Sequence, residues 1–384
     1  MRNLRLANAL AIVLILTGGC STIESLNPFA SSSSKIKPAE LPAIVPTAEL
    51  RVVWQSNIGE SKEFSFTPAV VGISLYAGAR DGAVARYDDG RQVWRINAGQ
   101  ALSGGVGSDG KLVVVGTSKG EVLAFDAASG NPVWKTRVNS EVLAAPAVND
   151  GLVVVRSGDS RIFGFESSDG KRRWVYQRAT PALSLRSFAG VLMAGRTILS
   201  GFPGGKLVAV SAENGAVLWE ATVALPKGAT ELERISDITS LPVVRGNAVC
   251  AVAYQGRVTC FDVSNGNQLW SREVSSSSGL DMDAKSVYVS DEKGAILAFD
   301  RSNGSSLWKQ DKLFMRGLSR PLVVGKQLVV ADADGVAHLV NCDDGSFAAR
   351  FGGDGGGISA DPQRFKDGLV IQTRSGGIFV LSVH

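Results

Sequence analysis

The chain has 384 residues, and its 40 Lys or Arg against 36 Asp or Glu leave a formal net charge of +4. The basic residues form no long run, so the electrostatic footprint of a nucleic-acid-binding protein is missing and we expect no nucleic acid as a partner. The two histidines, His338 and His384, stand in no Cys/His spacing typical of a metal site, and we therefore expect none.

The chain begins with a segment typical of bacterial export signals. Two arginines precede an uncharged, largely apolar run over residues 6–16, which is too short for an ordinary transmembrane helix. The run then meets a small-residue stretch that ends at Cys20 and resembles a lipobox, although Thr17 stands where a leucine is usual. We predict a lipoprotein signal peptide over residues 1–19 and lipidation of Cys20. The alternative is an ordinary secretory signal that is cut nearby.

Residues 20–46 are predicted to be the lipidated cysteine followed by a flexible tether, because they are rich in Ser, Pro and Ala and show no apolar period. Ser21 follows the cysteine where an aspartate would favour inner-membrane retention. The lipobox resemblance therefore implies anchoring at the periplasmic face of the outer membrane. The remaining residues, 47–384, have the length of a single barrel or propeller.

One segment recurs along residues 47–384. Its clearest copies are GEVLAFDAASGNPVW over 120–134, GRVTCFDVSNGNQLW over 256–270 and GAILAFDRSNGSSLW over 294–308. A later copy has Ala349 in place of the tryptophan, and the last copy is truncated at the end of the chain. The aspartate and the second glycine of each copy favour a tight turn. The tryptophan is predicted to pack against the neighbouring unit and to donate its indole N–H to a backbone carbonyl.

The repeat predicts an all-β fold, namely an eight-bladed β-propeller with four antiparallel strands per blade. All seven tryptophans are in register with the pattern, and each unit also contains two shorter apolar runs upstream. Trp54 has no repeat before it, whereas the last copy lacks its final strand. An N-terminal strand that joins the C-terminal blade would close the ring without a free sheet edge. Seven blades remain the alternative if the region around Ala349 departs from the plan.

Two intervals between tryptophans are longer than the others, which points to insertions after Trp174 and after Trp219. If the extra residues lie in the links between blades, the links 178–186 and 227–239 emerge at the same end of the propeller. Apolar side chains beside basic and acidic ones, on loops carried by a rigid scaffold, indicate a protein-binding patch.

The cysteines after Cys20 leave two interpretations open. Cys250 and Cys260 flank a predicted hairpin turn and could form a cross-strand disulfide in an oxidising periplasm. Alternatively they are buried free thiols that act as small hydrophobic side chains, since strand alternation would separate them in a neighbouring register.

The repeats resemble the tryptophan-docking repeats of quinoprotein dehydrogenases, which bind pyrroloquinoline quinone (PQQ) in an eight-bladed propeller. Together with the lipobox, the tether and the size, nearly the whole mature chain resembles the BamB family, lipoproteins of the β-barrel assembly (BAM) machinery. The resemblance implies a non-enzymatic scaffold without a cofactor, which binds the POTRA domains of BamA and assists folding and insertion of outer-membrane β-barrel proteins. Unfolded outer-membrane proteins are a further partner class, through pairing with sheet edges.

The same resemblance implies which residues contact BamA. Leu183 and Leu185 would supply apolar anchors, Arg186 a charged anchor, and Asp237 a salt bridge or hydrogen bond. The family's second acidic residue is Thr239 here, with Glu231 and Glu233 as the nearby acids that could compensate. The competing interpretation is that Leu183 and Leu185 start an inner strand and face a blade core.

Two other functions are weaker candidates than the scaffold. A PQQ-dependent dehydrogenase is disfavoured because no adjacent cysteine pair and no recognisable quinone site occur in the sequence. A hydrolase is disfavoured because the chain has no Gly-x-Ser-x-Gly elbow and no plausible histidine base. A propeller lipoprotein that binds another envelope partner remains the third alternative.

Overall fold

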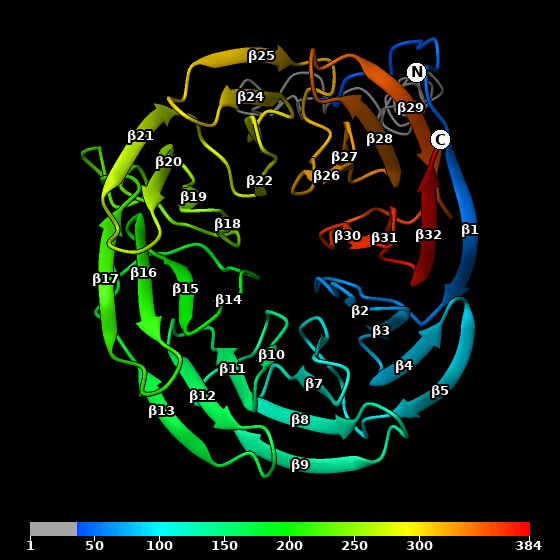
Figure 1. Cartoon of the computed structure of the whole chain (residues 1–384), viewed down its shortest axis with the longest axis vertical. Coiled ribbons are helices and arrows are strands. Elements are labelled where there is room, and N and C mark those ends of the chain that lie inside the picture. The colour runs from blue at the N-terminus through cyan, green and yellow to red at the C-terminus, as the bar shows by residue number, and fades with distance from the viewer. Residues whose placement is uncertain (1–36) are drawn as a thin grey trace, which may run out of the picture. The chain divides into compact units, whose positions relative to one another are not determined.

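The computed structural model describes residues 37–384, in which all regular elements are strands arranged as eight four-stranded antiparallel sheets. The sheets stand around a central axis as the blades of a propeller, with one strand of each blade at the centre and another at the rim (Figure 1). The predicted eight-bladed propeller is confirmed, and the seven-bladed alternative is wrong. The predicted signal peptide, Cys20 and most of the predicted tether lie outside the described residues. Residues 37–384 include no helix that is long and apolar enough to cross a membrane.

In every blade the four strands follow one another from the centre of the ring to its rim. Blade 1 contains β2 (Ala69–Val71), β3 (Ser74–Gly78), β4 (Ala83–Asp88) and β5 (Arg91–Asn97); blade 2 contains β6 (Gly107–Ser108), β7 (Leu112–Gly116), β8 (Glu121–Asp126) and β9 (Pro132–Arg137); blade 3 contains β10 (Ala147–Asn149), β11 (Leu152–Arg156), β12 (Ile162–Glu166) and β13 (Arg172–Tyr176); blade 4 contains β14 (Leu192–Ala194), β15 (Thr197–Phe202), β16 (Lys206–Ser211) and β17 (Val217–Thr222). Blade 5 contains β18 (Val243–Arg245), β19 (Ala248–Val252), β20 (Arg257–Asp262) and β21 (Gln268–Glu273); blade 6 contains β22 (Gly279–Met282), β23 (Ser286–Ser290), β24 (Ile296–Asp300) and β25 (Ser306–Gln310); blade 7 contains β26 (Leu322–Val324), β27 (Gln327–Ala331), β28 (Val336–Asn341) and β29 (Phe347–Gly352); blade 8 contains β30 (Gln363–Phe365), β31 (Gly368–Gln372), β32 (Gly377–Val383) and β1 (Leu50–Asn57).

The ring is closed by β1, which is the outer strand of blade 8. It pairs antiparallel with β32 in a register that runs from Leu50 opposite Val383 to Asn57 opposite Gly377. The first strand of the chain therefore completes the last blade, as the sequence predicted, and the ring closes through a continuous sheet.

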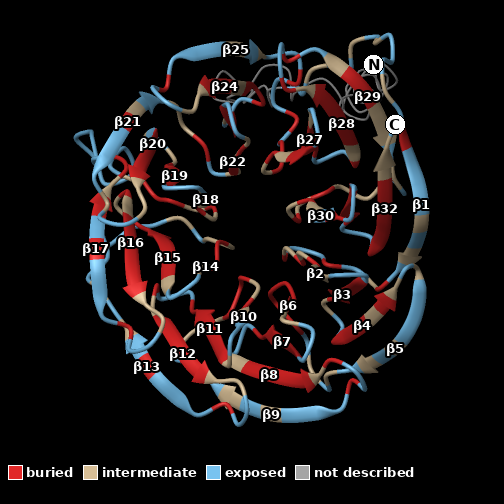
Figure 2. Ribbon diagram, in the orientation of Figure 1, coloured by how far each residue is buried: buried red, intermediate tan, exposed pale blue. Residues whose placement is uncertain are grey.

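The hydrophobic core is divided among the junctions between blades. The middle strands, such as β7 and β11, are buried throughout and consist mainly of valine and leucine, which suits strands covered on both faces. Each junction of neighbouring blades holds its own cluster; between blades 1 and 2, for example, Tyr76 packs in one cluster with Val113. The outer strands are largely exposed (Figure 2). Inner-strand residues such as Val70 and Val148 line a central cavity.

In blades 1 to 6 the repeated tryptophan joins the blade to the next one by a hydrogen bond. Trp134 on β9 donates its indole Nε1–H to the carbonyl of Ser167, 2.7 Å away, in the turn between β12 and β13 of blade 3. The same bond joins Trp94 to Ala127, Trp174 to Ala212, Trp219 to Val263, Trp270 to Arg301 and Trp308 to Cys342. The predicted role of the tryptophans is confirmed at these junctions.

Two structural features, the backbone conformation and a close contact, require a glycine in the turn of the repeat. Gly266, in the turn of blade 5, has a φ of +75°, a conformation that other residues adopt only with strain. Its Cα also lies under the Trp219 ring, so that a Cβ would come within 2.7 Å of a ring atom. The repeat therefore pairs an indole on one blade with a bare backbone on the next.

Two positions depart from this plan, and both lie next to the closure of the ring. The Trp54 Nε1–H on β1 is buried without a hydrogen-bond partner, because the turn between β4 and β5 is shorter than in the other blades and presents no carbonyl to it. Ala349 on β29 has no indole N–H to donate.

The strand register decides between the two interpretations of the cysteines. Cys250 on β19 lies directly opposite Cys260 on β20, and the two form a disulfide.

We predict that Gly266→Ala destabilises the propeller by roughly 2–4 kcal/mol, because the variant adds backbone strain and a clash with Trp219. The matched control is Gly195→Ala, which has a φ of +60° but nothing within 4 Å of its new Cβ. The control should lose about 1 kcal/mol from the strain alone. The measurement is the urea midpoint followed by tryptophan fluorescence. Equal shifts in the two variants would show that the indole contact contributes nothing.

Candidate functional site

The segments that connect blades gather at one end of the propeller. Each link runs from the outer strand of one blade to the inner strand of the next, and it bonds to the turn between the two middle strands of a blade. Val142, in a link, donates its N–H to the carbonyl of Thr117 in such a turn, and Ile238 donates to Phe202. We call this end of the propeller the link end.

The two longest links lie on either side of blade 4. They span residues 177–191, between β13 and β14, and residues 223–242, between β17 and β18. We call them the long links. They contain the segments 178–186 and 227–239, so the condition stated above, that the extra residues lie in blade-to-blade links, is met.

Leu183 and Leu185 lie within the first long link, outside any strand. The inner strand β14 begins only at Leu192, so the competing interpretation, in which both leucines start an inner strand, is wrong. Leu183 is 45% exposed, and Leu185 is half-buried. The backbone of this link bonds instead to the second long link, where the Asp237 side chain accepts the N–H of Leu185.

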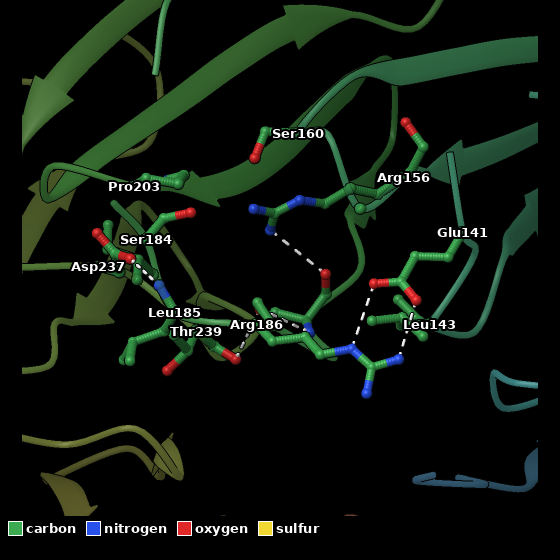
Figure 3. A pocket seen from close by; sticks show the side chains of 16 residues that line it. Glu141, Leu143, Arg156, Ser160, Ser184, Leu185, Arg186, Pro203, Asp237 and Thr239 are labelled. Atoms are coloured by element: carbon green, nitrogen blue, oxygen red, sulfur yellow. Dashed lines mark hydrogen bonds and ion pairs between the residues drawn. The ribbon is translucent and has the colours of Figure 1, made fainter. Parts of the chain in front are cut away.

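Asp237 makes this connection between the two long links (Figure 3). Its side chain lies inside the protein, with only 2% of the residue exposed. One carboxylate oxygen accepts the N–H of Leu185 at 2.7 Å, and the other accepts the N–H of Gly204 at 3.0 Å. In the structure Asp237 therefore positions the first long link, rather than presenting its carboxylate at the surface as the resemblance implied. Its effect on a partner would be exerted through Leu185 and its neighbours.

Arg186 is the charged group that the first long link presents at the surface. It forms two hydrogen bonds to Glu141, in the link that precedes blade 3, at 3.2 and 2.9 Å. Its guanidinium also lies over the rings of Phe64 and Phe188. The hydrogen bonds to Glu141 raise the pKa of Arg186 above its usual value. Because its side chain remains 49% exposed, Arg186 is both positioned and accessible.

Arg156 was not identified from the sequence, although it belongs to the same pocket as Arg186 and Asp237 (Figure 3). It ends β11, is 7% exposed, and donates to the carbonyl of Ala189 at 3.3 Å. Burial lowers the pKa of its guanidinium to about 10, an effect that Asp237 opposes. Gly116 holds the equivalent place at the end of β7. An arginine at the end of a buried strand is the signal that could have revealed it.

Thr239 also makes internal contacts. Its hydroxyl donates to the carbonyl of Ser277 at 2.9 Å, which joins the second long link to the link that follows blade 5. Of the two acids named beside it, Glu233 accepts the backbone N–H groups of Ala229 and Thr230, and Glu231 pairs at the surface with Arg234. Thr239 therefore braces the link in the structure.

The second long link carries its own exposed apolar side chains. Leu232 is 68% exposed, and Leu225 is also exposed. Leu225 lies outside the segment that the sequence singled out. Both long links thus present exposed leucines, and the first also presents the half-exposed Arg186.

Comparison with known proteins agrees with this architecture. A family model described as "Outer membrane protein assembly factor BamB" matches residues 80–310. The protein of that name from Nitrosomonas eutropha is 44% identical over 383 residues, covering 97% of this chain and 93% of the relative. The chain belongs to the BamB family. The BamB of Bordetella pertussis is 40% identical and is covered over its whole length, as is this chain.

Among solved structures that resemble this chain, one is a BamB and another shares only the fold. The crystal structure of BamB from Moraxella catarrhalis matches with a TM-score of 0.82 at 30% identity, covering 87% of this chain and 100% of that one. A quinohemoprotein alcohol dehydrogenase from Comamonas testosteroni reaches a TM-score of 0.69 at only 13% identity, covering 86% of this chain and 76% of that one. The enzyme shares the propeller alone. The prediction of a BamB-family protein, and not an enzyme, is thus confirmed.

We predict that Asp237→Ala frees the first long link. The variant leaves the N–H groups of Leu185 and Gly204 unpaired and removes the negative charge beside Arg156, so stability should fall by roughly 3 kcal/mol. Hydrogen exchange should show lost protection at Leu185 and Gly204.

The matched control for this prediction is Asp109→Ala. Asp109 also accepts two backbone N–H groups, but it does so in a partly exposed turn between β6 and β7. Its loss should cost about 1 kcal/mol and leave Leu185 protected. Unchanged exchange at Leu185 in Asp237→Ala would mean that Asp237 does not hold the link.

Proposed function

We propose that this protein is a lipid-anchored scaffold of the BAM complex at the periplasmic face of the outer membrane. In this role it binds the POTRA domains of BamA and assists folding and insertion of outer-membrane β-barrel proteins. Membership of the BamB family supports the proposal. The observation that carries it is the pair of braced long links with exposed leucines and Arg186 at one end of a rigid ring.

The bracing matters because a disordered loop loses conformational entropy when it binds. Asp237 holds Leu185 from the second long link, and Thr239 holds that link to its neighbour. The exposed leucines are therefore presented on a backbone that is already ordered, which lowers the cost of association. Leu183 and Leu232 supply apolar contact area, which binding would remove from water.

Arg186 supplies orientation and specificity. In the free protein its guanidinium is paired with Glu141 and stacked on two phenylalanine rings, so its position is set before a partner arrives. A carboxylate of the POTRA surface can take the place of Glu141 or share the guanidinium with it, since arginine presents five N–H donors in a planar fork. We expect such a contact to affect the choice of partner more than the total affinity.

We predict that the double variant Leu183→Ala/Arg186→Ala binds POTRA domains of BamA roughly 10- to 100-fold more weakly, because it removes an apolar and a charged anchor together. Affinity is measured by titration with purified POTRA domains, and folding is checked by circular dichroism. Leu307→Ala is the matched control, because Leu307 is a leucine of similar exposure, 51% against 45% for Leu183, on the rim strand β25. Wild-type affinity in the double variant would overturn the assignment of this surface.

A charge swap distinguishes a partner contact from an internal role of Arg186. In Arg186→Glu/Glu141→Arg the internal pair is kept with its charges exchanged. If Arg186 only positions its own link, the swap should restore binding that Arg186→Glu alone removes. If a POTRA carboxylate meets Arg186, binding should stay weak in the swap, and this is the result we expect.

Anchoring is tested separately from partner binding. Because Cys20 is the predicted site of lipidation, Cys20→Ser should prevent labelling with radioactive palmitate and release the protein from the outer-membrane fraction. A variant that still takes up the label and still sediments with the membranes would contradict the lipoprotein prediction.

A further inference from the structure

The chain enters the propeller along the outer edge of blade 7. Ala39 donates its N–H to the carbonyl of Phe314 at 2.9 Å, and Thr47 and Ala48 both donate to the carbonyl of Ala348 on β29. Ala48 also packs against the core cluster between blades 7 and 8. Residues 38–48, which we call the strap, therefore run from the link before blade 7 down to its outer strand.

Two arginines of blade 7 and its preceding link hold the strap by its backbone. Arg316 donates from Nη1 to the carbonyl of Ala39 at 3.1 Å, and Arg350 donates from Nη1 to the carbonyl of Pro42 at 2.6 Å. Charged donors make stronger bonds to carbonyl oxygens than neutral ones do. Such contacts recognise an extended backbone without depending on its side chains.

A buried polar cluster fixes both arginines. The Asp332 carboxylate accepts Arg316 Nε at 2.7 Å and lies 3.0 Å from His338 Nε2, and both Asp332 and His338 are fully buried. Arg350 Nε donates to His338 Nδ1 at 3.3 Å. The imidazole therefore carries its proton on Nε2 and is neutral, in keeping with burial, which lowers the pKa of His338 against the opposing effect of Asp332. The cluster orients both guanidinium groups toward the strap.

The strap lies where the repeat is broken. Ala349 on β29 replaces the tryptophan that the outer strands of blades 1 to 6 carry, and it belongs to the same cluster as Ala48. Ala348, beside it, accepts the two strap N–H groups. The strap, which leads into β1 of blade 8, thus packs beside the outer strand of blade 7 at the place where blades 1 to 6 carry an indole.

The strap begins at the link end of the propeller. Phe314 and Arg316 belong to the link 311–321, and the carbonyl of Arg316 accepts the N–H of Ala333 in the turn between β27 and β28. This is the link-to-turn contact that defines the link end elsewhere in the ring. The chain that leads back toward Cys20 therefore departs from the end that carries the long links.

We propose that residues 38–48 are an edge strap, clamped by Arg316 and Arg350, which caps the outer edge of blade 7 and makes the N-terminal anchor leave from the link end. The part that concerns the anchor rests on the proposed lipidation of Cys20. With the strap in place, the first backbone group held on the propeller is that of Ala39 rather than Thr47, so the point of attachment lies nearer to Cys20 along the chain. An unpaired strand edge is also covered.

The position of the strap is tested by distances between spin labels in the full, lipidated chain in detergent. One label is placed at Glu40→Cys, and the second at Lys312→Cys in the link or at Ser305→Cys in the turn at the opposite end of β25. We expect narrow distributions in both pairs, with the shorter distance to Lys312→Cys. A broad distribution, or a shorter distance to Ser305→Cys, would overturn the proposal.

The clamp is tested by hydrogen exchange of the strap amides. Arg350→Gln should raise exchange at Ala39, Thr47 and Ala48 at least tenfold. Arg301→Gln is the matched control, because Arg301 also donates to two backbone carbonyls but lies in blade 6. Unprotected strap amides in the wild type, or equal exchange in both variants, would refute the clamp, and protected amides in β27 verify folding.

The two tests of the strap are independent of partner binding. The Leu183→Ala/Arg186→Ala variant should keep the strap protected, and Arg350→Gln should keep its affinity for POTRA domains in solution. Failure of the strap and failure of the proposed function are therefore read from different measurements.

Discussion

The propeller depends on the contact between an indole and the glycine turn of the next blade. No blade has a core of its own, because each apolar cluster is shared by two neighbours. At the junctions that follow blades 1 to 6, the tryptophan places a flat ring on a bare backbone and makes one directed hydrogen bond. A ring assembled from such junctions is rigid, and this rigidity is what allows its links to hold a defined surface.

At blade 7 the junction with the next blade is formed without an indole. Where the indole is replaced by Ala349, the strap donates to Ala348 and its Ala48 joins the core. The first described residues therefore contribute twice at the closure of the ring: β1 completes the sheet of blade 8 by pairing with β32, and the residues just before β1 cover the edge of blade 7.

Charged side chains at the link end form hydrogen bonds with backbone groups that lie outside the strands. Strands satisfy their N–H and C=O groups in ladders, but the long links and the strap lack such partners. Asp237 supplies acceptors for Leu185 and Gly204, and the cluster around Asp332 aims Arg316 and Arg350 at strap carbonyls. A buried charge is expensive unless it is fully paired, so these groups are most useful where they order segments that function needs held still.

The sequence by itself determined the number of blades, the closure by the first strand and the location of the long links. These follow from a motif that repeats at a regular spacing and encodes local turns and strands. The sequence left open whether Leu183 is exposed or starts an inner strand, and the structure places it outside any strand with 45% of the residue exposed. Only the tertiary structure decided that Asp237 braces a link, that Arg156 lies beside it, and that Arg316 holds Ala39. The first and last of these contacts join residues 52 and 277 positions apart, and no local pattern specifies which side chains the closed ring brings together.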